Sequence, residues 1–304
     1  MAFFLNTIFG SLVSICITVL VTLAITLIFK TSYTTNFAQG VISAFGAFMA
    51  ATLINKAGVS IWLSVPVGIL LATAVAVFID MVIFRRGRYV NAIGKQIITM
   101  GLMSIIIGAI PLVFSITKLE RIEFPTFLSD VYTFNIGGGE VAITANAIVC
   151  VAITAVIVTA IFVLLKYSKW GLSVRATASN EFVAGMMGIN THIVTAISWG
   201  LAGALGALAA CLYAGQTPLT STFMTDYQVN AFLAGILGGF GSFYGPIIAA
   251  VIIPLANNLM MWIGGVANAP DLTTWTRVIV YGLILVVIFF KPNGLFGKRT
   301  AKKV

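Results

Sequence analysis

Charge is what this sequence has least of. Lys, Arg, Asp and Glu make up only 8% of the 304 residues, whereas 60% of the residues are hydrophobic and the mean hydropathy is +1.09. A soluble domain carries about 25% charged residues, which cover the surface that faces water. So little charge excludes a water-soluble globular protein and predicts an all-α polytopic membrane protein.

Residue types that carry chemistry are also scarce. The single histidine, His192, stands at the edge of an apolar segment, and the three cysteines, Cys16, Cys150 and Cys211, lie inside apolar runs. No second histidine, carboxylate or thiol stands at the spacing that a metal site needs. Clusters of acid, base and nucleophile are equally lacking in the sequence. We therefore predict neither a metal site nor an enzyme.

A nucleotide-binding motif is missing as well. The stretch GLFGKRT at 294–300 resembles a phosphate-binding loop, but Pro292 stands where the first glycine belongs. Arg299 stands where Ser or Thr should hold magnesium, and an apolar helix rather than a strand precedes the stretch. The sequence therefore predicts no ATP site of this kind in the chain.

Ionisable groups deep in the apolar segments are almost absent. Asp80 stands in the last turn of one segment, where we expect an interfacial ion pair with Arg85 or Arg86. Carriers driven by protons or sodium keep ionisable groups deep in the membrane. We therefore expect a largely apolar pathway and an energy source outside this chain.

Nine apolar segments are candidates for crossing the membrane, since a helix needs about 20 apolar residues to do so. They cover residues 9–29, 37–54, 61–84, 97–116, 143–165, 193–213, 229–243, 246–263 and 278–290. The second and seventh are short and rich in glycine, so either could be broken or re-entrant. The sequence predicts eight or nine transmembrane helices, and a polar stretch at 117–142.

The basic residues predict an orientation. With the N-terminus outside and the C-terminus cytoplasmic, 13 of the 17 lysines and arginines fall on the inner side. The other four fall outside: Lys56, Lys118, Arg121 and Arg277. Because cytoplasmic loops carry the excess of Lys and Arg, this split supports that orientation and explains the net charge of +9 without nucleic acid.

Two stretches share a pattern that suggests an inverted repeat. FAQGVISAFGAF at 37–48 and FLAGILGGFGSF at 232–243 agree in five of twelve positions, and the two copies run in opposite directions in the nine-span topology. Inverted repeats with glycine-interrupted helices are typical of transporters and meet near the substrate path. Simple glycine-rich helix packing accounts for the pattern equally well.

The polar stretch at 169–190 interrupts the apolar segments and forms its own short helix. We expect Gly171 to break the fifth span, Ser179 or Asn180 to cap the new helix, and Gly188 to stop it. Its apolar face is Phe182, Val183, Met186 and Met187. Such a helix can lie on a membrane or dock into a groove of a soluble partner.

Four motifs together resemble a known family. They are GLSVRATASNEFVAGMMGIN at 171–190, NFAQG at 36–40 with GAF at 46–48, LGGFGSFYGPIIAA at 237–250 and KPNGLFGK at 291–298. In this order and spacing they are similar to the permease subunits of bacterial ABC importers of the branched-chain amino-acid transport family. The stretch KTSYTT at 30–35 is more polar than that family's usual lead-in.

The resemblance implies a single permease domain over 1–304, with a cytoplasmic coupling loop at 166–192. It implies a second permease subunit, homologous or identical, two ABC ATPase subunits that bind ATP and Mg, and an extracytoplasmic substrate-binding protein. The chain itself would need no cofactor. It would lie among lipids in the bacterial cytoplasmic (inner) membrane.

The resemblance also implies roles for individual residues. Coupling to the ATPase is expected of Gly171, Arg175, Ala176, Glu181, Phe182, Ala184, Met186 and Gly188, with Arg175 anchoring the loop. Close helix packing near the substrate pathway is expected of Asn36, Gln39, Gly40, Gly46, Gly235, Gly238, Gly239 and Gly241.

Other readings stay open at this point. A permease of the same superfamily could carry urea, amides, sugars or nucleosides. A stand-alone channel or secondary carrier would fit if the short helix lies on the membrane. An intramembrane enzyme is disfavoured by the lack of catalytic clusters.

Overall fold

The computed structural model describes residues 2–87, 90–114, 124–136 and 139–297. Within this part of the chain, eight helices are long and apolar enough to cross a membrane: α1 (Ala2–Ser32), α2 (Gln39–Ala57), α3 (Ile61–Ile79) with its π-helical extension η1 (Asp80–Phe84), α4 (Ala92–Val113), α5 (Ala145–Tyr167), α8 (Thr191–Ala214), α10 (Tyr244–Val266) and α11 (Pro270–Phe290). The shorter elements are α6 (Lys169–Ser179), α7 (Glu181–Met186), α9 (Thr225–Gly238) and the strands β1 (Val131–Ile136) and β2 (Gly139–Thr144). The prediction of an all-α polytopic membrane protein is confirmed.

Helix α1 forms the centre of the molecule. Its 31 residues extend about 46 Å, and from Cys16 to Ile28 they are buried on every side. Helices α5, α8, α9 and α10 pack around it, while α2 and α3 pack against α8. Helices α4 and α11 lie at the periphery and leave most of their surface exposed. A helix that is apolar all round, as α1 is, suits a buried position.

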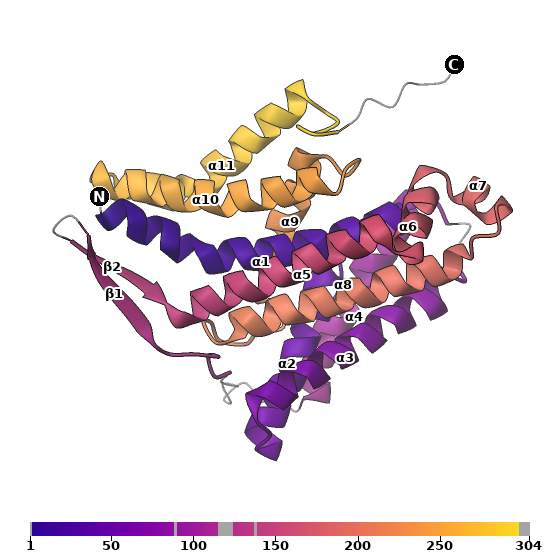
Figure 1. The fold of residues 1–304 in the computed structure, drawn as a ribbon, viewed down its shortest axis with the longest axis horizontal. Coiled ribbons are helices and arrows are strands. Elements are labelled where there is room, and N and C mark those ends of the chain that lie inside the picture. Colours follow the sequence, from indigo (N-terminus) through magenta and orange to yellow (C-terminus); the bar gives the residue numbers. More distant parts are fainter. Residues whose placement is uncertain (1, 88–89, 115–123, 137–138, 298–304) are drawn as a thin grey trace.

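The two ends of the helix bundle differ in what they carry. The start of α1, the β1–β2 hairpin and the α10–α11 turn lie at one end, on the left of Figure 1, which we call the hairpin end. Helices α6 and α7 lie at the other, on the right, which we call the α7 end, and α11 runs toward it (Figure 1). The first and last helices therefore begin and finish at opposite ends, which requires an odd number of passages.

Helix α9 provides the odd passage without crossing the whole bilayer. Its 14 residues extend about 21 Å, whereas the hydrocarbon core is about 30 Å thick. It ends at Gly238 because Gly239 has φ +85°, a conformation that interrupts a helix. The expectation that the seventh segment, 229–243, could be broken is therefore confirmed, since its last five residues form a turn. The second segment, in contrast, is a full helix of 19 residues.

The polar stretch expected at 117–142 contains a hairpin that the sequence reading missed. Strands β1 and β2 pair antiparallel, with Val131 opposite Thr144. Asn6 of α1 fixes this hairpin, since its side chain donates to the carbonyl of Glu140 at 2.9 Å and accepts from the backbone N–H of Ala142 at 2.9 Å. The hairpin therefore packs against the start of α1, the central helix.

Some of the lysines and arginines that predict the orientation lie outside the described residues. They are Arg88, Lys118, Arg121 and the basic residues of 298–304, including Arg299 of the stretch that resembles a phosphate-binding loop. The assignment of the α7 end to the cytoplasm therefore stays a prediction.

Candidate functional site

Residues 168–190 join α5 to α8, and we call this segment the elbow. Side chains that cap its short helices set its shape. Helix α5 ends at Tyr167, and the hydroxyl of Ser168 caps α6 by accepting from the backbone N–H of Gly171 at 2.9 Å. A Cβ at Gly171 would lie 2.4 Å from the carbonyl oxygens of Leu164 and Leu165. The expectation that Gly171 breaks the fifth span is wrong: the chain turns at Ser168, and the glycine lets α6 pack on the end of α5.

Arg175 links α6 to the end of α5. Its guanidinium donates to the carbonyl oxygen of Leu165, one of the last carbonyls of α5, which have no partner within the helix. Ala176, one residue further along α6, is half-buried. The structure thus gives Arg175 a partner within its own chain.

Helix α7 presents an apolar surface away from the bundle. The side chain of Asn180 caps it by accepting from the N–H of Val183 at 3.1 Å, and Gly188, with φ +84°, ends the segment. Phe182, Met186 and Met187 are 75%, 74% and 80% exposed. In contrast, Ala184 is buried and faces its own chain. The predicted coupling residues therefore divide between an outward and an inward face.

A small polar cavity lies behind α7. Glu181 of α7 and His192 and Thr195 of α8 line it together with Asp80 and Arg85, in a volume of about 40 Å³. Thr195 donates to the buried Asp80 carboxylate at 3.4 Å. The sequence reading expected an interfacial contact of Asp80 with the arginines. Within the described residues the structure instead gives Asp80 a hydroxyl partner on α8 and no ion pair with Arg85 or Arg86.

Buried amides join α2, α8 and α9 in the middle of the bundle. Asn36 donates to Gln39 at 3.2 Å, and Gln39 donates to the carbonyl of Ala202 at 2.9 Å. The backbone N–H of Gly40 donates to the side-chain oxygen of Gln228 on α9. These groups are neutral and buried, so each needs the partner it has. Gln228 is a member of this junction that the sequence reading missed.

The predicted packing glycines fall into two groups. Gly40 and Gly46 lie in helix contacts: a Cβ at Gly46 would meet Ala207 at 2.6 Å, and one at Gly40 would meet Gln228 at 2.7 Å. Gly235 lies against the ring of Phe240, 2.1 Å from such a Cβ, in the turn that follows α9. These positions have no room for a side chain.

The other group belongs to the break between α9 and α10. Gly238 lies against Gly245 so closely that a Cβ would meet its backbone at 2.1 Å. Gly239 is in the turn itself, and Gly241 is exposed there, with its carbonyl accepting from Lys30 at 2.5 Å. The expectation of helix packing is therefore wrong for Gly241, because the helix has already ended.

Two of the sequence motifs meet at this break. The backbone N–H of Leu295 donates to the carbonyl of Leu237 at 2.7 Å, and that of Phe296 donates to Gly238 at 3.3 Å. The segment at 291–297 thereby satisfies the last carbonyls of α9, which have no partner in the helix. Lys298, the last residue of this motif, lies outside the described residues.

The two copies of the suggested inverted repeat, 37–48 and 232–243, contact each other in the structure. This contact does not test whether they share an origin. The rings of Phe37 and Phe232, the first residues of the two copies, lie 4.9 Å apart. Helix α9 starts at Thr225 and finishes beside Leu295, and its second residue, Asp226, binds Arg277 near the hairpin end of α11. Helix α2 runs the other way, toward the hairpin end. The two copies are therefore antiparallel neighbours.

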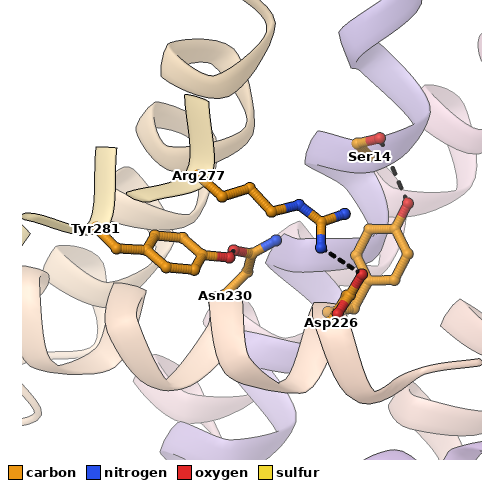
Figure 2. A network of polar contacts seen from close by, with 6 residues as sticks. Ser14, Asp226, Asn230, Arg277 and Tyr281 are labelled. Carbon is orange, nitrogen blue, oxygen red and sulfur yellow. Dashed lines mark hydrogen bonds and ion pairs between the residues drawn. The ribbon is translucent and has the colours of Figure 1, made fainter. Parts of the chain in front are cut away.

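A polar cavity at the hairpin end is the feature that the sequence reading missed. Figure 2 shows Arg277 of α11 reaching toward Asp226 of α9, with 2.8 Å between their charged groups. Tyr281 donates to Asn230 at 2.7 Å, and Ser14 of α1 shares a 3.4 Å hydrogen bond with Tyr227 (Figure 2). The cavity has a volume of about 340 Å³.

This cavity corrects one expectation. Arg277 was placed outside the apolar segments, but it is the eighth residue of α11. The expectation of a largely apolar pathway stays a prediction. A signal existed in the sequence: Thr273, Arg277 and Tyr281 recur every four residues, as do Asp226 and Asn230, so each set shares one helix face.

Comparison with known proteins gives consistent matches along the chain. A family model described as branched-chain amino acid transport system / permease component matches residues 7–289. The high-affinity branched-chain amino acid transport system permease protein BraD of Pseudomonas aeruginosa is 26% identical over 284 residues, covering 88% of each chain. The protein LivH of Escherichia coli (strain K12), which has the same description, is 26% identical over 291 residues, covering 88% of this chain and 87% of that protein.

A solved structure has a similar fold. PsaBC from Streptococcus pneumoniae, determined in complex with Fab, contains a chain that matches with a TM-score of 0.54 and 13% sequence identity. The match covers 93% of this chain and 91% of that one. At this identity the likeness concerns the fold alone.

Proposed function

Because this chain belongs to the family of branched-chain amino acid transport permease components, we propose that it is the membrane-spanning subunit of an ABC importer for branched-chain or related amino acids. Separate ATPase subunits drive this importer, and the chain supplies the path through the bacterial inner membrane. The names of the relatives support the amino-acid substrate over urea, sugars or nucleosides.

The exposed apolar surface of α7 is the observation that carries the proposal. Helix α7 lies at the extreme of the bundle, beyond the ends of the membrane helices (Figure 1). Phe182, Met186 and Met187 project from it into the surroundings. Flexible, polarizable methionines suit an adaptable apolar contact, and a short apolar helix face suits a groove on a soluble partner. We assign that groove to the ATPase.

The elbow would pass movement of α7 into the bundle. Arg175 fastens α6 to the end of α5, and α7 leads directly into α8. Both α5 and α8 pack on the central α1. Closure of the ATPases on ATP would displace α7, and a rigid connection of this kind would tip the helices between outward-facing and inward-facing arrangements.

The remaining partners follow from the same assignment. A second permease subunit, identical or homologous, would complete the pore, since the charged side chains of the hairpin-end cavity are exposed in this chain alone. A substrate-binding protein outside the cell would deliver the amino acid. ATP and Mg would bind to the ATPases and not to this chain.

Reconstitution of the complete importer in proteoliposomes tests the coupling surface. Glu181→Lys places a cation in the first turn of α7, where the helix dipole disfavours it, and Gly188→Trp puts a bulky residue at a positive φ. We expect either variant to insert into the membrane but to lower ATP-driven uptake at least about tenfold, equivalent to about 1.4 kcal/mol of coupling.

A matched charge reversal provides the control. Asp271→Lys lies in the first turn of α11, at the hairpin end, and should leave ATP-driven uptake unchanged. Normal uptake by both α7 variants would overturn the coupling assignment. Uptake by the chain alone, without ATPase or nucleotide, would instead establish a stand-alone channel or carrier with α7 lying on the membrane.

A further inference from the structure

Arg277 of the ion pair in the hairpin-end cavity lies well inside its helix and not at the helix end. Arg277 is the eighth residue of α11, so its Cα lies about 10 Å along the helix from the hairpin end. On α10, Asn258 lies about 12 Å from the same end of its helix. Charged side chains at such depth face a water-filled path or a partner, not lipid.

The two charged groups are accessible despite this depth. The side chains of Arg277 and Asp226 are 66% and 60% exposed. They come from α11 and α9 and meet across the cavity, as Figure 2 shows. An exposed ion pair contributes about 0 to 1 kcal/mol, so separating the two groups costs little. A ligand can therefore separate Arg277 from Asp226 at little cost in free energy.

The shape and lining of the cavity fit a small molecule. Its volume of about 340 Å³ lies at the lower end of the range of about 300–1,000 Å³ for ligand pockets. Apolar wall is provided by Phe223, Pro254 and Met261. Asn257 also lines the cavity, and its buried side-chain oxygen has no hydrogen-bond partner. The cavity thus combines one cation, one anion, a free acceptor and an apolar side.

We propose that this cavity is a transit site for an apolar α-amino acid, with Arg277 binding the α-carboxylate and Asp226 the α-ammonium group. The proposal rests on the proposed function, which supplies an amino acid as the transported substrate. Arg277 gives a carboxylate a planar set of N–H donors, only one of which is used in the contact with Asp226.

Charge balance explains why the site holds an ion pair and not a single charge. A zwitterion carries one positive and one negative group, so its entry between Arg277 and Asp226 replaces one ion pair with two. The net charge in the cavity is zero before and after binding. No unpaired charge is left in the membrane when the amino acid leaves. Weak, reversible binding of this kind is what passage requires.

Thiol labelling of the full-length chain in intact cells tests the site. Cys16, Cys150 and Cys211 are buried, so an impermeant thiol reagent should react only with an introduced cysteine. Thr274→Cys places the reporter on an exposed position that lines the cavity, and Met261→Cys places a second reporter on α10. Asp271→Cys, exposed one turn away on α11 and outside the lining, is the matched control.

We expect L-leucine to slow labelling at 274 and 261 by about threefold at twice its dissociation constant, and not at 271. Leucine amide lacks the carboxylate and 4-methylpentanoate lacks the ammonium group, so neither should protect. Arg277→Gln should abolish the protection, while Arg277→Lys, which keeps the charge but not the planar donors, should retain only part of it. Asp226→Asn should lose protection too, which covers the case that Arg277→Gln fails to reach the membrane.

Several results would overturn the transit site. One is protection by all three compounds alike, another is none by leucine at any soluble concentration. A third is protection by leucine that persists in the Arg277→Gln variant. In that case the ion pair would only stabilise the packing of α9 against α11. If the complete importer takes up leucine but leucine gives no protection at 274 or 261, the result contradicts the proposed transit site and leaves the proposed function standing. If the complete importer takes up no amino acid, the result contradicts the proposed function instead.

Discussion

At the scale of single residues, two glycines hold the C-terminal segment against the break after α9. Gly239 and Gly294 have φ values of +85° and +80°, and a Cβ on Gly294 would lie 2.5 Å from the Cα of Gly239. The backbones approach this closely because neither residue has a side chain. The contact makes one structural unit of two motifs that are more than forty residues apart in the sequence.

Replacing Gly239 should therefore destabilise this unit. Gly239→Ala forces a methyl group to within 2.5 Å of the Asn293 carbonyl at a φ that L-residues avoid, and should cost at least about 2 kcal/mol. Gly101→Ala in α4, where nothing lies within 4 Å, is the control and should not destabilise. Thermal unfolding in detergent measures both, and equal midpoints for the two variants would contradict the prediction.

Residue roles could be predicted from the sequence where they depend on local chemistry. Asn180 as a cap and Gly188 as a stop follow from the preferences of these residue types, and the structure has both. Arg277 could not be assigned, because its meaning depends on Asp226, 51 residues away on another helix. Charge counting placed it on a loop, since the start of α11 is polar.

At the scale of elements, α7 is a helix too short to be stable by itself. Isolated helices below about 12 residues are marginal in water, and α7 has six. Its buried contact is limited to Ala184, so its end caps carry much of its stability. Helix α8 has the same kind of asparagine cap, Asn190, but is held by packing along its 24 residues.

The cap should therefore matter for α7 and not for α8. Asn180→Ala removes the hydrogen bond to the N–H of Val183 and should cost about 1 kcal/mol locally. Hydrogen exchange over residues 181–187 should accelerate about fivefold. Asn190→Ala removes the matching bond to Ile193 and should leave exchange along α8 unchanged. Unchanged exchange in α7 would show that something other than the cap holds it.

Elements with strong apolar patterns were predicted well, whereas for the seventh segment a break was foreseen but its position was not. The eight long helices coincide with predicted segments because about 20 apolar residues have few alternatives in a bilayer. Helix α9 ends inside its predicted segment because the stop is the positive φ of Gly239, in a stretch of many glycines. Which glycine bends the chain depends on tertiary packing, here that of Asn293 and Gly297 against Gly239.

At the scale of the whole molecule, the two ends of the bundle are chemically distinct. The α7 end carries Arg85 and Lys95 around the cavity behind α7, whereas the hairpin end carries the β1–β2 strands and the polar cavity. The proposed coupling surface and the proposed transit site therefore lie at opposite ends. Helices α1 and α8 line both cavities, α1 through Ser32 and Ser14 and α8 through Thr195 and Tyr213, so they connect the two ends.

The basic residues predict the sidedness of the molecule, because cytoplasmic segments keep the excess of Lys and Arg during insertion. Of the ten lysines and arginines that the structure describes, eight lie toward the α7 end. Met187→Cys, on a side chain that is 80% exposed, should therefore react with an impermeant thiol reagent only after the cells are opened. Asp130→Cys, exposed just before β1, should react in intact cells. The buried native cysteines make the unmodified chain the blank for both. A reversed pattern would place α7 outside, where no ATPase could reach it, and would remove the coupling mechanism together with the orientation.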